Sequence, residues 1–504
     1  MSGYDTYSSP LASRNASPEM LRLWSPRHKF NTWRRIWLAV AEAQHELGLP
    51  VTKEQVEELR AVVNRPGGIT DEEIKAAEKY ERDLRHDVMA HVHALGDSCP
   101  KAKGIIHLGM TSQDVVCNAD LLVLFDSIDL TTQKVRRLLI AFGEQASTWK
   151  TCPSLGFTHY QAAQPVTVGR RLAQYSHEAE SCYLRLGAYL THATVGGICL
   201  KGLRGATGTQ ASYLSLLGND GAAVDSLEER FARKLSRWEF SAPYCFGLVT
   251  QTYPRVIDTF ILADLASTAS VLHKIATDIR LLCNRKELDE PFEDKQIGSS
   301  AMPYKRNPMR CERICGLTRF VMNLVGNAYD TAATQWLERT LDDSSNRRLS
   351  LPEAFLALDG ALDLMHNVAS GLIVHEAMVR KNLLAELPFM ATENILMACV
   401  KLGGDRQHYH ELIRVHAQAA GHRVKHEGLD NDLLERLKND RNFWSASRGG
   451  PLSAELDWDG LLDPMKYIGR SVEQTERFIR EVVEPLREQF KDSLANLSES
   501  APKV

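Results

Sequence analysis

The segment 296–308, QIGSSAMPYKRNP, combines a glycine, paired serines, two prolines and two cations in one short run. Gly298 permits backbone angles that other residues avoid, and Pro303 and Pro308 interrupt helices and strands. We therefore expect a shaped, mobile loop that ends where a helix begins near Met309. A serine hydroxyl here can accept a proton, and the neighbouring cations can hold a carboxylate. A solvated turn whose serines cap the next helix is the plainer interpretation.

The order Gly-Ser-Ser-x-Met-Pro-x-Lys-x-Asn-Pro resembles the signature of the fumarase/aspartase superfamily. With Tyr304 and Arg306 at the variable positions, it is similar to the adenylosuccinate lyase family within it. The resemblance extends from about residue 10 to about residue 428. It implies a carbon–nitrogen lyase of the amidine-lyase type that releases fumarate from adenylosuccinate to give AMP. It also implies cleavage of the succinyl-aminoimidazole-carboxamide ribotide of purine biosynthesis.

In this family the first serine of the signature removes the proton from carbon, so the resemblance implies that Ser299 is the general base. A serine is a base only when its pKa is depressed, which requires Lys305 and loop amides to stabilise the alkoxide. Lys305 and Asn307 then resemble partners of the succinyl carboxylates. Without the family match, an exposed charge and a turn amide describe them as well.

The general acid is expected in the segment 155–165, LGFTHYQAAQP, which lies between two predicted helices. Histidine can donate and recover a proton near neutral pH. Taken alone, any one of the 17 histidines would more often be structural or solvated. The Thr-His-x-Gln-x-Ala-Gln context resembles the motif that carries the family's general acid, and this implies that role for His159.

Three histidines in RHDVMAHVH, at positions 86, 91 and 93, suggest a metal site at first sight. On a helix, His91 and His93 point about 200° apart, and His86 lies about 10 Å from His93 in rise. This geometry disfavours one ion held by all three. The Arg-His-Asp run resembles the family's substrate-contacting segment, which implies substrate contacts for Arg85, His86 and Asp87, with His86 assisting catalysis.

Further substrate contacts are expected at the start of a long helix and in an arginine-rich run. Thr111 and Ser112 follow a glycine, and their hydroxyls can cap the helix or hold a carboxylate at its positive end. The run 339–348, RTLDDSSNRR, offers guanidinium groups that bind phosphate, although a solvated charge run is the ordinary interpretation. The resemblance implies nucleotide contacts for Arg339, Ser344 and Arg348.

Four more positions match substrate contacts only through the resemblance: Arg14, Asn15, Gln251 and Arg313. Arg14 matches a phosphate contact. The family commonly has tyrosine where this chain has Asn15, so an aromatic hydroxyl is lost at that position.

The hydrophobic pattern is helical nearly throughout. Between residues 255 and 290 there is neither glycine nor proline, and apolar residues recur every three or four positions. A helix of that extent would be roughly 50 Å long and needs tertiary burial to be stable. Similar stretches cover 118–150, 165–194, 309–335 and 352–370, and shorter helices are expected at 32–47 and 71–95.

These patterns predict an all-α chain with three helical domains around a long central bundle: 1–111, 112–370 and 371–504. This agrees with the fumarase/aspartase-like fold that the resemblance implies, in which the central bundles of four subunits pack together. The expected site residues are spread from Arg14 to Arg348, which a single bundle does not easily bring together. The resemblance implies a homotetramer in which each active site combines segments of different subunits.

Composition excludes several other classes of protein. A net charge of −4 argues against a general nucleic-acid binder, and no run of 18 apolar residues predicts a membrane span. The ten cysteines lack zinc-like spacing, the N-terminus has no apolar leader, and a cytoplasmic protein with free thiols is expected. No metal or organic cofactor is suggested. A sister lyase, such as argininosuccinate lyase or fumarase, and a catalytically silent scaffold are the alternatives.

Overall fold

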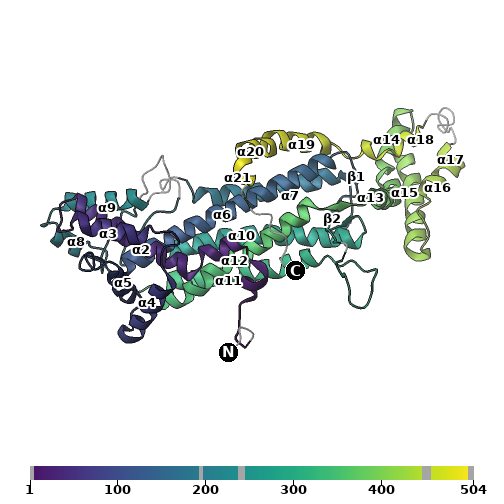
Figure 1. The fold of residues 1–504 in the computed structure, drawn as a ribbon. Helices are drawn as coiled ribbons and strands as arrows, with labels where there is room; N and C mark the ends of the chain where they lie inside the picture. Colours follow the sequence, from purple (N-terminus) through teal and green to yellow (C-terminus); the bar gives the residue numbers. More distant parts are fainter. Residues whose placement is uncertain are drawn as a thin grey trace.

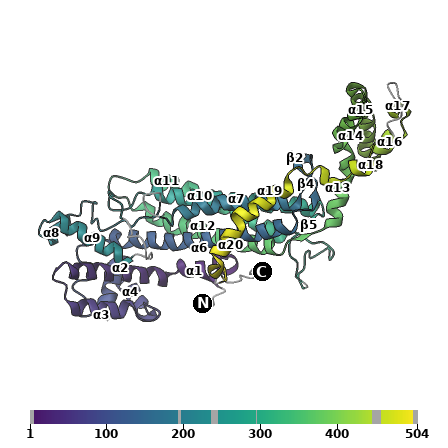
Figure 2. The same ribbon diagram turned by 90° about the horizontal axis from the view of Figure 1, so that it is seen from above.

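The computed structural model describes residues 5–191, 197–235, 245–293, 295–444, 456–495 and 497. The fold is elongated and almost entirely helical (Figures 1 and 2). Five long helices run side by side along its axis and form the central bundle. They are α6 (Ser112–Thr148), α7 (Val168–Ala188), α10 (Val256–Asn284), α11 (Met309–Ala333) and α12 (Asp342–Ser370). The predicted all-α fold with a long central bundle is confirmed.

Shorter helices lie at both ends of this bundle and along it. Before α6 come η1 (Leu11–Asn15), α1 (Pro18–Leu23), α2 (Pro26–Glu46), α3 (Lys53–Val63), α4 (Asp71–Leu84) and α5 (Asp87–Ser98). Between α7 and α10 come α8 (Ala211–Leu216) and α9 (Gly221–Leu235). After α12 come α13 (Glu376–Met390), α14 (Thr392–Lys401), α15 (Arg406–His422), η3 (Arg423–Glu427), α16 (Leu433–Asn439), α17 (Arg441–Trp444), α18 (Trp458–Leu461), η5 (Pro464–Lys466), α19 (Ser471–Phe478), η6 (Ile479–Val483), α20 (Glu484–Gln489) and α21 (Lys491–Ala495).

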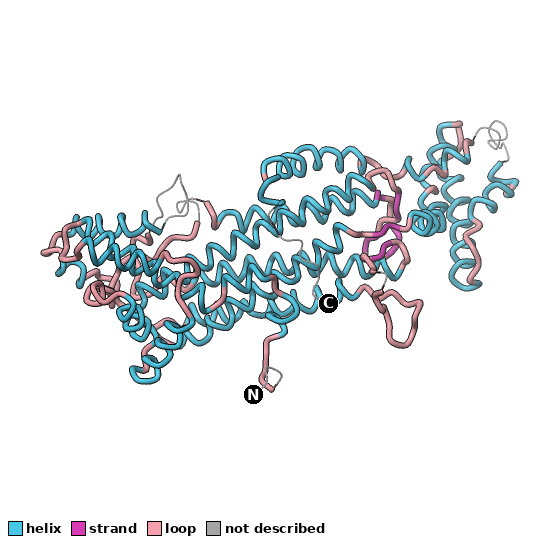
Figure 3. The backbone as a smooth tube through the Cα atoms, in the orientation of Figure 1, coloured by secondary structure: helices cyan, strands magenta, loops and turns pink. Residues whose placement is uncertain are grey.

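The described strands are two residues long and gather at one end of the bundle (Figure 3). They form three antiparallel pairs: β1 (Pro153–Ser154) with β4 (Val166–Thr167), β2 (Phe157–Thr158) with β3 (Gln161–Ala162), and β5 (Leu288–Asp289) with β6 (Ile373–Val374). These pairs fix the segments that connect the long helices at this end. The chain around His159 is therefore a hairpin and not part of a helix.

Three large groups of buried apolar side chains stabilise the molecule. The largest fills the central bundle and includes Ile261, Leu265 and Leu272 of α10. A second joins α2, α3 and α5 to the start of α6 and to α8 and α9. A third lies within α14–α17 and their neighbours. The division of the chain at residues 111 and 370 remains a prediction.

Helix α10 is long and apolar enough to span a membrane by length and composition. Half of its most apolar window is buried inside the structure, and its apolar side chains belong to the bundle core. A buried core helix satisfies the same criteria of length and hydropathy, because it too is surrounded by apolar groups.

Several helix boundaries differ from the prediction by a few residues, and two differences are larger. The single helix expected at 71–95 is two helices, because Arg85 adopts a left-handed conformation with φ of 52° and ends α4. The helix expected from Pro352 instead begins at Asp342 and includes Pro352. Proline removes one helical hydrogen bond, but buried ion pairs of Arg347 hold the first turns of α12 in place.

Buried His91 makes stability depend on pH. Its ring stacks on Phe30 at 3.8 Å between centroids, and burial, followed by the charges of Arg34 and Lys29, lowers its pKa from 6.5 to about 4. The unfolded chain therefore binds a proton that the folded chain does not between these pH values. We expect the free energy of unfolding to fall as pH drops from 6.5 towards 4, by up to about 1.4 kcal/mol per pH unit.

Urea unfolding at pH 7 and pH 5, at one protein concentration, checks this expectation. His91→Phe should reduce the loss of stability at pH 5, whereas the same change at exposed His410 should leave the wild-type dependence intact. An equal loss at pH 5 in wild type and His91→Phe would contradict it.

Candidate active site

His86 and Ser112 meet where α5 and α6 begin. His86 is the N-cap of α5, and its Nδ1 accepts a hydrogen bond from the Met89 N–H at 3.3 Å. A neutral imidazole that accepts at Nδ1 carries its proton on Nε2. Nε2 lies 3.4 Å from Ser112 Oγ, so His86 donates to this hydroxyl. The two residues predicted to contact substrate thus lie side by side, each at the N-terminus of its helix.

The three nearby histidines have different surroundings. His91 is buried against Phe30, and His93 stacks on Tyr80 at 5.3 Å between centroids. Across the described residues, no group of three or more His, Cys, Asp or Glu side chains is arranged to hold a metal ion.

Asp87 connects the start of α5 to the arginine run. Its Oδ2 accepts from Arg348 NH2 at 3.1 Å, and Arg348 remains 60% exposed. Lys29 adds a second cation nearby, with Nζ 4.9 Å from the centre of the Trp33 ring. Burial, followed by the charge of Arg348, lowers the pKa of Lys29. An anion bound beside Arg348 would therefore meet two positive groups.

The buried carboxylate of Asp114 fixes the Thr111–Ser112 turn. Its Oδ2 accepts from the Thr111 N–H at 3.0 Å and from the Tyr213 hydroxyl at 3.2 Å. Its Oδ1 accepts from the ammonium of Lys201 and from the backbone N–H groups of residues 204 and 205. This many donors hold the carboxylate in one position. The start of α6 is thereby tied to a loop almost ninety residues later in the chain.

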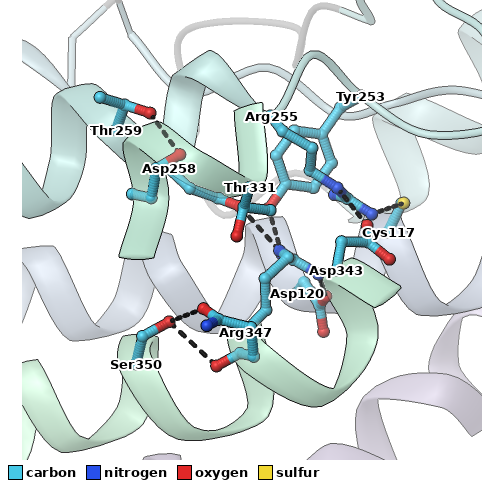
Figure 4. Close-up of polar contacts among 12 residues, drawn as sticks. Cys117, Asp120, Tyr253, Arg255, Asp258, Thr259, Thr331, Asp343, Arg347 and Ser350 are labelled. Atoms are coloured by element: carbon cyan, nitrogen blue, oxygen red, sulfur yellow. Dashed lines mark hydrogen bonds and ion pairs between the residues drawn. The ribbon is translucent and has the colours of Figure 1, made fainter. Parts of the chain in front are cut away.

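A buried ionic network supports the same end of the bundle (Figure 4). Arg347 Nε donates to Asp258 Oδ2 at 2.7 Å, and its NH1 donates to Asp120 Oδ2 at 2.9 Å. Asp258 Oδ1 also accepts from the Tyr253 hydroxyl at 2.6 Å. Because Arg347 is fully engaged and buried, Arg348 is the arginine of this pair that is free to face a ligand.

Asp343 links this network to the other predicted nucleotide contacts. Its Oδ2 accepts from Arg255 Nε at 2.7 Å and from Arg339 NH1 at 3.1 Å. The Gln251 N–H donates to Glu338 O at 3.3 Å, immediately before Arg339. Ser344 lies in the first turn of α12, beside Asp343. Arg339, Ser344, Arg348 and Gln251 therefore belong to one end of the bundle, with His86, Asp87 and Ser112.

His159 lies at the opposite end, at the tip of the β2–β3 hairpin. Thr158 pairs with Gln161, so His159 and Tyr160 form a two-residue turn. Their φ values of 53° and 56° are those of a type I′ turn, whose twist matches the two strands. Both side chains are exposed, and the Tyr160 ring packs on Phe157 at 5.6 Å. The hairpin thus presents the imidazole to solvent.

Ser299 lies in an exposed loop beyond β5, as expected. Its Oγ accepts from the Met302 N–H at 3.1 Å, and Asn307 Nδ2 closes the loop by donating to Gly298 O at 2.8 Å. A Cβ at position 298 would lie 2.2 Å from Lys305 O, so only glycine fits there. The serine caps a turn inside the loop, and α11 begins at Met309 as predicted.

Arg14 and Arg313 are neighbours, and Arg313 lies near the start of α11. Burial, then the charges of Arg14 and Arg310, lowers the pKa of Arg313. Arg14 and Asn15 belong to η1, which packs on α12. Asn15 Nδ2 donates to Pro10 O at 2.9 Å. The amide that replaces the family's tyrosine hydroxyl is therefore used within η1.

Two residues of α12 hold the N-terminal segment around Arg14 in place. Buried Asp359 accepts from the Ser17 N–H at 2.6 Å and pairs with Lys134 at 2.5 Å. Gly360 allows the closest approach, because a Cβ there would lie 2.8 Å from Asn15 O. The position of Arg14 therefore depends on α12.

The structure does not bring His86 and His159 together within one chain. Ser112, which contacts His86, begins α6, and Thr148, five residues before β1, ends it. A helix of 37 residues is about 55 Å long. The site residues therefore form separate groups: the His86 group at one end, and the His159 hairpin and Ser299 loop towards the other (Figures 1 and 2).

Sequence patterns missed the residues that hold these groups in place. Asp114 carried a signal, since it stands three residues after Thr111 as in a capping box. Arg347 and Arg348 are adjacent residues of the same type, so the sequence could not show which one is buried in ion pairs and which one is exposed. Asp343, Asp258 and Lys29 carried no signal, because their partners are distant in the chain.

The chain matches known families over most of its length. The family described as Lyase matches residues 13–323, and that described as Adenylosuccinate lyase C-terminus matches 388–478. Adenylosuccinate lyase of Schizosaccharomyces pombe is 47% identical over 98% of both chains, and that of Saccharomyces cerevisiae is 46% identical over the same share. The archaeal enzyme of Archaeoglobus fulgidus is 33% identical over 95% of this chain and 99% of its own.

Solved structures share the fold at lower identity. The 3-carboxy-cis,cis-muconate lactonizing enzyme of Pseudomonas putida has a TM-score of 0.77 and 24% identity, covering 95% of this chain and 99% of its own. A fumarate lyase from Mesorhizobium sp. BNC1 has a TM-score of 0.75 and 21% identity, covering 94% and 99%. These two confirm the fumarase/aspartase-like fold alone. From the full-length relatives and the family matches, the chain belongs to the adenylosuccinate lyase family of the fumarase/aspartase superfamily.

Proposed function

We propose that this protein eliminates fumarate from adenylosuccinate, giving AMP, and from the succinyl-aminoimidazole-carboxamide ribotide of purine biosynthesis. The observation that carries the proposal is the match to adenylosuccinate lyases over 98% of the chain. The arginine groups around Arg339 and Arg348 add support, because a phosphate-bearing substrate needs guanidinium donors. Argininosuccinate and malate carry no phosphate, which favours this reaction over those of the sister lyases.

In the proposed mechanism, Ser299 removes the proton from the carbon beside a succinyl carboxylate. The electron pair then forms the carbon–carbon double bond of fumarate as the carbon–nitrogen bond breaks. His159 gives its proton to the departing nitrogen, which becomes the amino group of AMP. The Met302 N–H donor to Ser299 Oγ supports the role of the base, because a donor to the charged form lowers a pKa.

The remaining predicted residues bind and orient the substrate. Lys305 and Asn307 would face the succinyl carboxylates, and His86 with Ser112 would hold a carboxylate at the N-terminus of α6. Arg85 and Asp87 border that turn, and Thr111 supplies its cap. Arg14, Asn15, Gln251, Arg313, Arg339, Ser344 and Arg348 complete the proposed nucleotide contacts.

We further propose a homotetramer in which each site combines segments of different subunits. The length of α6 supports this, since it separates His86 from His159 by tens of ångströms in one chain. Large apolar side chains remain exposed on the bundle helices, including Phe260 at 52%, Tyr329 at 58% and Leu349 at 65%. Exposed apolar surface of this kind is typical of an interface.

A cytoplasmic location is proposed as well, because all ten cysteines are free.

The experiment is to follow fumarate and AMP formation from adenylosuccinate by the purified full-length protein. Argininosuccinate and malate are offered in parallel reactions. We expect turnover of adenylosuccinate and of the ribotide substrate only. A folded tetramer that binds AMP without turnover would instead indicate a silent scaffold, and turnover of argininosuccinate would indicate a sister lyase.

The close contact between Gly360 of α12 and the segment of Arg14 gives a prediction about substrate affinity. In Gly360→Ala the new Cβ meets Asn15 O, so the Arg14 segment must shift by a fraction of an ångström. We expect KM for adenylosuccinate to rise by roughly tenfold with a smaller change in kcat, because a binding group is misplaced. Steady-state kinetics measure both constants.

Gly421→Ala is the matched control, since nothing lies within 4 Å of a Cβ at this position of α15. It should leave KM at the wild-type value. A Gly360→Ala protein with wild-type KM and an unchanged melting temperature would show that the contact at Gly360 does not position a substrate-binding residue.

A further inference from the structure

A cavity of about 540 Å³ lies beside the His159 hairpin. It is bounded by the hairpin, by α7, by the second half of α10 and by the segment 467–474 at the start of α19. Its volume is in the range of sites that hold small molecules. None of the active-site residues proposed above lines it, so it is a separate feature of the chain.

Two guanidinium groups in the wall of this cavity have only neutral partners among the described residues. Arg170 donates to Gln474 Oε1 at 2.9 Å and to Gln174 Oε1 at 3.4 Å. Arg171 donates to Ser154 Oγ at 3.2 Å and to Leu155 O at 2.8 Å. Half-buried arginines ordinarily have a carboxylate partner or bind an anion. Neither arginine forms an ion pair within the described part of the chain, although the Asp278 carboxylate also lines the cavity.

The local electrostatics strengthen this positive potential. Arg170 and Arg171 lie in the first turn of α7, where the helix dipole is positive and cations are unfavourable. The third cation in the wall, Lys274, is already paired with Glu178 at 3.4 Å and with Asp278 at 3.1 Å. An anion entering the cavity would therefore neutralise the arginines without competing with an existing ion pair of theirs.

Aromatic rings form much of the remaining wall. Phe157, Tyr160, Tyr175 and Tyr467 line the cavity, and Lys274 Nζ lies 4.6 Å from the centre of the Tyr175 ring. Aromatic side chains offer flat apolar surfaces to a planar group. The wall thus combines donors for an anion with surfaces for a ring.

We propose that this cavity binds a small phosphate monoester that carries a planar ring. The phosphate oxygens accept hydrogen bonds from the guanidinium groups of Arg170 and Arg171, and the ring packs between the aromatic walls. The occupant contacts Phe157 and Tyr160. Because Tyr160 and His159 form the turn of the hairpin, binding affects the position of that turn. Within one chain the cavity is separated from the proposed nucleotide contacts at Arg339 and Arg348, which lie at the other end of the bundle.

Calorimetric titration of the full-length tetramer with phenyl phosphate tests the proposal. The double variant Arg339→Gln/Arg348→Gln removes two of the proposed active-site phosphate contacts, and it should still bind one phenyl phosphate per chain. Within that background, Arg170→Gln should weaken this binding about tenfold, because a charge-assisted hydrogen bond is lost. Inorganic phosphate and phenol, titrated separately, should each bind more weakly than phenyl phosphate.

Leu281→Trp provides an independent variant, since it fills the cavity without altering an arginine. It should abolish binding at unchanged melting temperature. Arg477→Gln is the matched control: it removes an exposed charge from α19 that does not line the cavity. The proposal is overturned if Arg170→Gln and Leu281→Trp bind phenyl phosphate as tightly as Arg477→Gln, or if the double variant binds none.

Discussion

Ser299→Ala is expected to lower kcat for adenylosuccinate by about a thousandfold, the contribution of a positioned general base. The variant removes one oxygen from an exposed loop, so the fold should be unaffected. KM should change little, because the loop contacts of Lys305 and Asn307 remain. Initial rates of fumarate release, together with the melting temperature, measure the effect.

Ser300→Ala is the natural control for this prediction. It removes an equivalent hydroxyl from the neighbouring position, which is also in the exposed loop. Its kcat should stay within a few-fold of wild type. If Ser299→Ala kept more than a tenth of the wild-type kcat, Ser299 would not be the base.

Mixing two inactive variants is expected to restore activity, which is the second large effect. His159→Ala should lose its activity as Ser299→Ala does, because the departing nitrogen lacks its acid. If each site takes the serine and the histidine from different chains, about a quarter of the sites in equally mixed tetramers receive both intact residues. Activity should therefore rise from near zero to a similar fraction of wild type after joint refolding or coexpression.

A pair of variants within one loop is the control for this experiment. Ser299 and Lys305 belong to the same loop of the same chain, closed by Asn307 and Gly298. Every site in a mixture of Ser299→Ala and Lys305→Gln then contains one defective loop, so no activity should return. Recovery in this control, or its absence in the first mixture, would contradict composite sites.

The sequence alone determined the chemistry that the chain offers and the kind of fold that carries it. The signature loop was predicted because glycine and proline restrict the backbone locally, and Ser299 and Met309 lie where that argument placed them. The long helices were predicted because apolar residues recur every three or four positions within each segment. Even there, proline at 352 suggested a helix start, whereas buried ion pairs of Arg347 extend α12 ten residues further back.

Only the tertiary structure decided which of these residues meet. Arg348 faces Asp87 across 261 positions of sequence, and Asp114 is held by Lys201 from a separate loop. Such pairs arise from packing between distant segments, so no local pattern encodes them. The separation of His86 from His159 also depends on the folded helix: α6 is 37 residues long, and its length of about 55 Å holds the two groups apart.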